Sequence, residues 1–92
     1  MGQTEMGRMI RYGVEFLPRA LKDFKRIPRT DMERIFDRVE RMRDDLAGDV
    51  KRLVHFTTEY RLRVGDYRVL FNIEGNIIVV WRVLQRAAAY DW

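Results

Sequence analysis

Residues 60–71 read Tyr-Arg-Leu-Arg-Val-Gly-Asp-Tyr-Arg-Val-Leu-Phe, two alternating runs joined by Gly65-Asp66. Glycine supplies the positive φ that a type II′ turn needs at its first central position, so a two-residue hairpin is predicted here. Side chains alternate between the two faces of a strand, and this register gathers apolar residues on one face. The predicted cross-strand pairs are Val64 with Tyr67, Arg63 with Arg68, Leu62 with Val69, and Tyr60 with Phe71.

The other face of the hairpin carries Arg61, Arg63, Arg68 and Leu70. Arg63 is expected directly opposite Arg68. Like charges in that position destabilise a sheet, and the cost in stability lies within the roughly 0.2–1 kcal/mol range of cross-strand pair effects. Folding alone gives no reason for this arrangement, whereas a bound anion would remove the repulsion. The hairpin therefore predicts an anion-binding surface.

Two helices are predicted before the hairpin. The first begins near Pro18, which suits the first turn of a helix, and stops at Pro28. The second begins at Thr30-Asp31-Met32-Glu33, which matches a capping box. Both have apolar residues at helical spacing, and both are expected to cover a sheet. These residues are Ala20, Leu21, Phe24 and Ile27 in the first helix, and Met32, Ile35, Phe36, Val39, Met42 and Leu46 in the second, which runs to Gly48.

Three further strands are predicted, at residues 9–16, 50–54 and 77–84. The run Ile77–Trp81 is continuously apolar, which is typical of a strand covered on both faces. The turn before it, Glu74-Gly75-Asn76, fits a loop of two or three residues, so its register stays open. The expected fold is α+β, a small antiparallel sheet with an N-terminal helical hairpin packed on one face, in the order β-α-α-β-β-β.

Composition limits the chemistry. The chain has 92 residues, 18 Lys and Arg against 14 Asp and Glu, a net charge of +4, no cysteine and a single histidine. Thiolate catalysis and cysteine-based zinc sites are excluded, and neither a metal, a small-molecule cofactor nor a membrane partner is expected. Cytoplasmic localisation is predicted. Residues 1–8 are expected to form a flexible extension before a single domain at residues 9–92.

A wider pattern accompanies the hairpin: Lys51-Arg52-Leu53 precedes it, and Arg86 and Tyr90 follow. Over residues 9–92 the chain resembles the RelE/ParE superfamily of bacterial toxins. The resemblance implies a toxin that acts on the ribosome as a metal-independent mRNA endoribonuclease. It also implies a cognate antitoxin as the partner of this toxin. It implies catalytic roles for Arg61, Arg63, Arg68, Arg86 and Tyr90, and RNA binding by Lys51, Arg52, Arg61, Arg63 and Arg82.

Two positions depart from the family pattern. Members often have lysine at one or both of the strand positions 61 and 63 and histidine just before the terminal arginine, where this chain has Gln85. Arginine is a poor proton acceptor, so Tyr90, Glu59, Asp66, the ribosome or solvent would take that role. Two alternatives stay open: a ParE-like inhibitor that binds DNA gyrase without chemistry, and an inactive RNA- or protein-binding relative.

Overall fold

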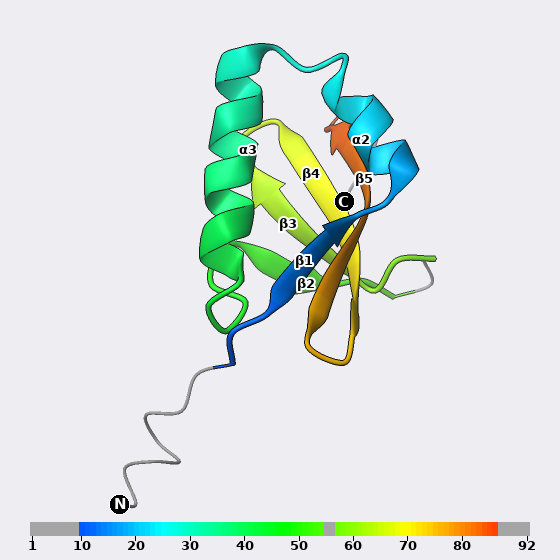
Figure 1. Cartoon of the computed structure of the whole chain (residues 1–92). Coiled ribbons are helices and arrows are strands. Elements are labelled where there is room, and N and C mark those ends of the chain that lie inside the picture. The colour runs from blue at the N-terminus through cyan, green and yellow to red at the C-terminus, as the bar shows by residue number, and fades with distance from the viewer. Residues whose placement is uncertain (1–9, 55–56, 87–92) are drawn as a thin grey trace, which may run out of the picture.

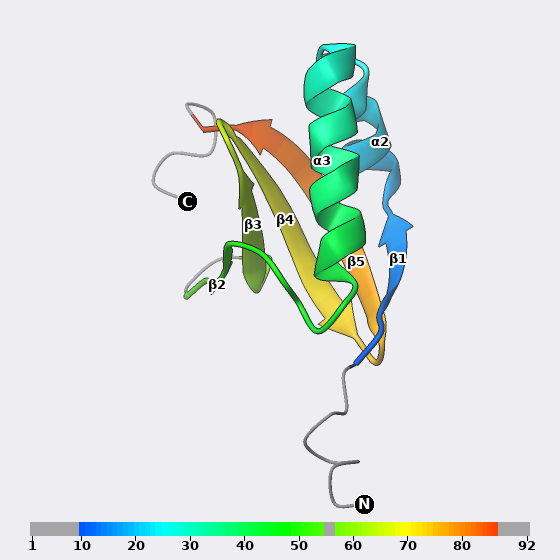
Figure 2. The ribbon, with the colours of Figure 1, turned by 90° about the vertical axis from the view of Figure 1, so that its left-hand side faces the viewer.

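The computed structural model describes residues 10–54 and 57–86, in which two helices lie on one face of a five-stranded sheet (Figures 1 and 2). The α+β class and the helical hairpin on one face are confirmed. Four strands follow the helices, as the separate strand predictions have it, whereas the order β-α-α-β-β-β contains three. The elements are β1 (Gly13–Phe16), α2 (Pro18–Phe24), α3 (Arg29–Met42), β2 (Val50–Arg52), β3 (Tyr60–Val64), β4 (Tyr67–Glu74) and β5 (Ile77–Gln85).

The sheet is mixed, so the prediction of an antiparallel sheet was wrong for one strand. The strand order is β1-β5-β4-β3-β2, and β2 to β5 form an antiparallel meander. β1 joins the far edge in parallel with β5, pairing Gly13 with Ile77 and Phe16 with Val80. A parallel pair needs a long crossover, and here the whole of the intervening chain supplies it.

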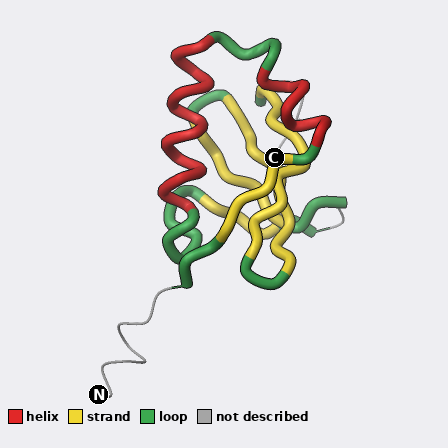
Figure 3. The backbone as a smooth tube through the Cα atoms, viewed as in Figure 1, coloured by secondary structure: helices red, strands yellow, loops and turns green. Residues whose placement is uncertain are grey.

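The β3–β4 hairpin has the predicted register, with Arg63 opposite Arg68 and Val64 opposite Tyr67. Gly65 has a φ of +57°, as the turn requires. The following turn holds two residues, since Glu74 pairs with Ile77, and Figure 3 shows both tight connections. A β-bulge then shifts the register between β4 and β5.

The core lies between the helices and the apolar face of the sheet. Ala20 and Ile35 are fully buried, and Phe71, at the centre of β4, is 0% exposed. Tyr67 joins α3 to β4 by donating a hydrogen bond to Asp31 at 3.0 Å. Burial and the Asp31 carboxylate raise the pKa of Tyr67, so its phenol stays protonated and keeps this donor role.

The predicted capping box was wrong. α3 begins at Arg29, one residue after Pro28, and no side chain caps its N-terminus. The Pro28 carbonyl accepts from the Met32 amide at 2.9 Å and starts the helix, so Thr30 already lies within the first turn. Glu33 instead forms an exposed ion pair with Arg29 at 3.5 Å.

α3 also ends earlier than predicted. It stops at Met42, and the segment that follows pairs with the chain before β1, where the Tyr12 amide donates to the Arg43 carbonyl at 2.8 Å. A second amide, from Asp45, donates to the Ile10 carbonyl at 2.8 Å. These bonds to the N-terminal segment end the helix before Gly48.

A candidate nucleic-acid interface on the hairpin

Four arginines come together beside the β3–β4 hairpin, on the sheet face opposite the helices; we call Arg61, Arg63, Arg68 and Arg86 the arginine set. Register places the first three on that face. Arg86 directly follows β5, and its amide donates to the Asp66 carbonyl at 2.6 Å. This bond holds the end of β5 against the hairpin turn. The structure thus brings together four of the five side chains predicted to be catalytic.

Arg61 is held rigidly at the edge of the set. Arg61 is 9% exposed, and its Nη1 atom donates to the Asp49 carbonyl at 2.7 Å and to Asp49 Oδ1 at 3.1 Å. Its Nε atom is buried and has no hydrogen-bond partner among the residues that the structure describes. Buried charged donors are normally satisfied, so this Nε atom is an exception within the set.

Arg68 forms the centre of the set and is only 4% exposed. Its Nη1 atom donates to the carbonyls of Gly65 and Tyr67, each at 2.9 Å, so its guanidinium is held by the turn. Burial and then the positive charges of Arg63, Arg61 and Arg86 lower the pKa of Arg68. The arginine set is therefore a site of concentrated positive charge.

Arg63 is the exposed member on the strands, and it forms no ion pair within residues 10–54 and 57–86. Lys51 extends the same face, because it pairs in register with Arg61 on β2 and is exposed. Arg52 points to the other face, where its guanidinium lies 5.9 Å from the ring centre of Tyr60. Of the predicted RNA-binding residues on β2, the structure thus places Lys51 beside the arginine set.

Arg82 lies apart from the set, against α2. Its Nε and Nη2 atoms donate to the Asp23 carboxylate at 2.8 and 3.0 Å, and the Val83 amide donates to the same carboxylate at 2.9 Å. Burial opposes ionisation of Asp23, but these hydrogen bonds and the nearby arginine charges lower its pKa. Sequence reasoning did not find this pair, because 59 residues separate its members.

Asp49 is the carboxylate that sequence reasoning missed. It lies in the loop before β2, is 56% exposed at its side chain, and bonds directly to Arg61. Glu59 lies at the far end of the hairpin, where its amide donates to Asn72 Oδ1 at 2.6 Å. Tyr90 and residues 1–8 lie outside the described residues. Nothing in the sequence around Asp49 distinguishes it from other loop aspartates.

Among residues 10–54 and 57–86, no three His, Cys, Asp or Glu side chains lie close enough together to hold a metal ion. None of the described helices has the length and apolar character needed to cross a membrane.

Comparison with known proteins identifies the family. A family model described as ParE toxin of type II toxin-antitoxin system, parDE, matches residues 14–90. The chain belongs to this toxin family. It is 33% identical over 84 residues to Toxin RelE3 of Methanocaldococcus jannaschii, covering 86% of this chain and 96% of the relative. The predicted RelE/ParE membership and the role as a type II toxin are therefore confirmed.

Solved structures agree with this assignment. The RelB-RelE antitoxin-toxin complex from Methanococcus jannaschii contains a chain 32% identical to this toxin, with a TM-score of 0.69 over 84% of this toxin and 95% of that chain. The RelBE2 complex from Mycobacterium tuberculosis contains a chain with the same fold, at 23% identity and a TM-score of 0.69, covering 84% of this toxin and all of that chain.

Proposed function

We propose that this toxin stops translation by cutting mRNA on the ribosome, in the cytoplasm. The observation that carries the proposal is the arginine set, in which Arg63 and Arg86 are exposed beside the buried Arg61 and Arg68. Arginine binds phosphate oxygens through a planar fork and keeps its charge even when crowded. Four such groups on one face suit a polyanion such as RNA.

The chemistry needs no metal, because RNA carries its own nucleophile. In the proposed reaction the 2′-OH loses its proton and attacks the adjacent phosphorus, and the 5′-oxygen of the next nucleotide leaves with a proton. The toxin holds the 2′-OH in line and stabilises the negative charge that develops on the phosphate. Arg63 and Arg86 would bind the phosphate, while Arg61 and Arg68 supply fixed positive charge beneath it.

The proposed reaction also needs a group that accepts the proton of the 2′-OH. Asp49 is bonded to the set and half-exposed, so it joins Tyr90, Glu59 and Asp66 as a candidate. The hydrogen bond from Arg61 aims one carboxylate oxygen and leaves the other available. Asp49 is bonded directly to the arginine set, whereas Glu59 lies at the far end of the hairpin, and this position supports Asp49 over Glu59.

A cognate antitoxin is proposed as the partner. Both solved relatives are antitoxin–toxin complexes, as their descriptions state. A basic sheet face of this kind suits an acidic segment that is disordered when free and orders on binding.

A second candidate function is inhibition of DNA gyrase by binding alone. It is favoured by the family description, which names ParE. In that case the arginine set would contact an acidic surface of the target, and no covalent step would occur.

Induced expression followed by mapping of cellular RNA 5′ ends distinguishes the ribonuclease from the gyrase inhibitor. Cuts inside translated codons, abolished by Arg63→Gln and kept in the exposed control Arg38→Gln on α3, are expected. Cuts should persist in chelator when the ribosomes stay intact. DNA damage without such cuts would identify the gyrase inhibitor instead.

A further inference from the structure

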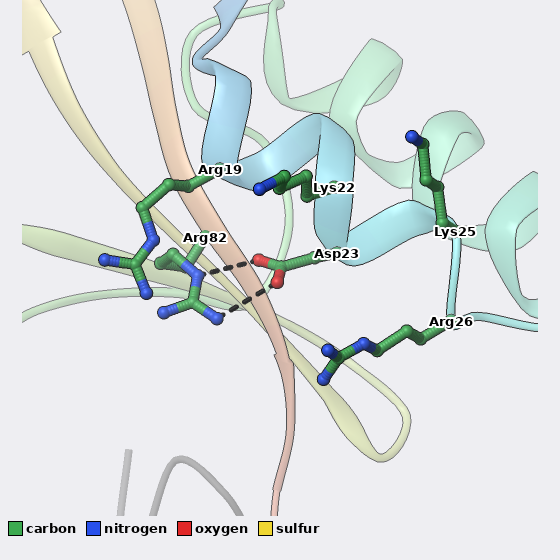
Figure 4. A pocket seen from close by; sticks show the side chains of 6 residues that line it. All are labelled: Arg19, Lys22, Asp23, Lys25, Arg26 and Arg82. Atoms are coloured by element: carbon green, nitrogen blue, oxygen red, sulfur yellow. Dashed lines mark hydrogen bonds and ion pairs between the residues drawn. The ribbon is translucent and has the colours of Figure 1, made fainter.

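A second basic surface lies between α2 and β5, away from the hairpin. It is a pocket of about 580 Å³, and Figure 4 shows Arg19, Lys22 and Asp23 of α2 gathered around Arg82 of β5. Arg82 rises from β5 and is fixed by its two bonds to Asp23, so the floor of the pocket is rigid. We call this site the α2 pocket. Its lining residues are Arg19, Lys22, Asp23, Lys25, Arg26 and Arg82.

The positive charge of the α2 pocket is not balanced locally. Five basic side chains face one carboxylate, and that carboxylate is already bonded to Arg82. Within the described ranges none of the four basic residues on α2 and its C-terminal end forms a salt bridge. The lining alone therefore carries as much net positive charge as the formal +4 of the whole chain.

α3 provides the contrast. There Arg29, Arg34 and Arg41 each form an ion pair one helical turn away, with Glu33, Asp31 and Asp37. Such mixed faces are ordinary solvated helix surfaces. In the α2 pocket one carboxylate, Asp23, is shared among five basic side chains and is already paired with Arg82, so positive charge stays in excess there.

The pocket also leads toward the arginine set. A smaller adjoining hollow of about 200 Å³ shares Asp23, Arg26 and Arg82 with it and continues along β5 to Gln85. Arg86, a member of the set, is the next residue. The α2 pocket and the arginine set are therefore neighbours along β5.

We propose that the α2 pocket binds the sugar-phosphate backbone of RNA, as a second site that holds the RNA while the arginine set acts on one phosphate. The inference builds on the proposed ribonuclease function. All six lining residues are charged, whereas protein interfaces have cores depleted in charge and rich in aromatic residues. Interfaces with nucleic acid are polar and strongly basic, and phosphate contacts position the ligand without reading its sequence.

The test is the affinity of the isolated toxin for fluorescein-labelled RNA, measured by anisotropy over a series of salt concentrations. The variant is Lys22→Gln with Arg26→Gln, which removes two charges and keeps the Asp23–Arg82 pair. The matched control is Arg38→Gln with Arg41→Gln, which removes two charges from α3. Each lost phosphate contact lowers the slope of log affinity against log salt by about 0.7 for single-stranded RNA.

A decrease of about 1.4 in the pocket variant, with little change in the control, is expected for RNAs of unrelated sequence. Equal decreases in both variants would show general charge attraction and overturn the proposal. Unchanged RNA affinity with weakened antitoxin binding would assign the pocket to the protein partner and also overturn it. Because binding is measured without cleavage, failure of the ribonuclease proposal would leave the expected slopes unchanged.

Discussion

Arg63 and Arg68 face each other across the β3–β4 hairpin, yet Arg63 is exposed and Arg68 is 4% exposed. The two arginines therefore have different roles, although they are cross-strand partners. Arg68 is bonded to the backbone of the turn, whereas Arg63 is available to a ligand. Replacing each arginine should therefore give different results.

Arg63→Gln should keep the fold and reduce cleavage. Removing one of two facing charges relieves cross-strand repulsion, so the melting temperature should stay the same or rise slightly. Loss of one preorganised charge donor typically lowers a rate by about 10²–10³. Thermal unfolding and ribosome-bound mRNA cleavage are the two measurements. A destabilised variant that cleaves normally would contradict a catalytic role.

Arg68→Gln should instead destabilise the protein. Its guanidinium bonds to the carbonyls of Gly65 and Tyr67, and leaving buried polar groups unsatisfied costs about 1–3 kcal/mol. The free energy of unfolding from urea titration measures this loss. Stability equal to that of the Arg63→Gln variant would show that these bonds contribute nothing.

Asp49→Asn should test the proton acceptor. The amide is nearly isosteric and can still accept from Arg61, but it cannot take a proton. General base catalysis contributes about 10²–10⁴ in rate, so single-turnover cleavage should fall within that range while mRNA binding holds. Asp37→Asn serves as the control, since Asp37 is an exposed carboxylate on α3 that pairs with Arg41. Full activity in Asp49→Asn would assign the role to another group.

Asp23→Asn should flatten the acid dependence of stability. The pKa of Asp23 is lower in the folded protein than in the unfolded chain. Its contribution is therefore fully present above the unfolded value and is lost as the pH falls through the folded value. Urea unfolding at several pH values between about 2 and 7 should show a smaller decrease for the variant. Identical pH profiles would mean that the Arg82 pair does not stabilise the fold.

Gly65→Ala should cost about 1–2 kcal/mol, because an L-residue is strained at a φ of +57°. An added Cβ would also lie 2.6 Å from Arg34 Nη2, the mobile end of a side chain. Gly75→Ala is the matched control, with a φ of +62° and open space around it. Similar losses would show that backbone strain dominates and that Arg34 moves aside. A much larger loss at Gly65 would show that Arg34 is fixed over the turn.

The features that sequence reasoning predicted are those with local causes. Alternation and the glycine at position 65 determine the hairpin register, and helical spacing identifies the buried faces, including Ile35 and Val39. Local spacing is less reliable at edges: Leu21 and Phe36 belong to the predicted apolar stripes but are 52% and 41% exposed. Phe36 nevertheless stacks on Phe24, with ring centres 4.7 Å apart.

The features that sequence reasoning missed depend on contacts between segments far apart in the chain. The parallel pairing of β1 with β5 has no local signal, and the Asp23–Arg82 pair joins residues far apart in the chain. The burial of Arg61 likewise depends on the loop that carries Asp49. Four arginines of the candidate site could be named from the sequence, but not which of them would be buried.

The parallel contact between β1 and β5 also orders events during synthesis. Gly13 cannot reach its partner Ile77 until β5, the last described strand, has left the ribosome. Such distant pairings form slowly, because loop closure must precede them. The same strand carries the chain to Arg86, so the arginine set is assembled only after the sheet is nearly complete. A nascent chain would therefore lack the complete arginine set until the last described strand has paired.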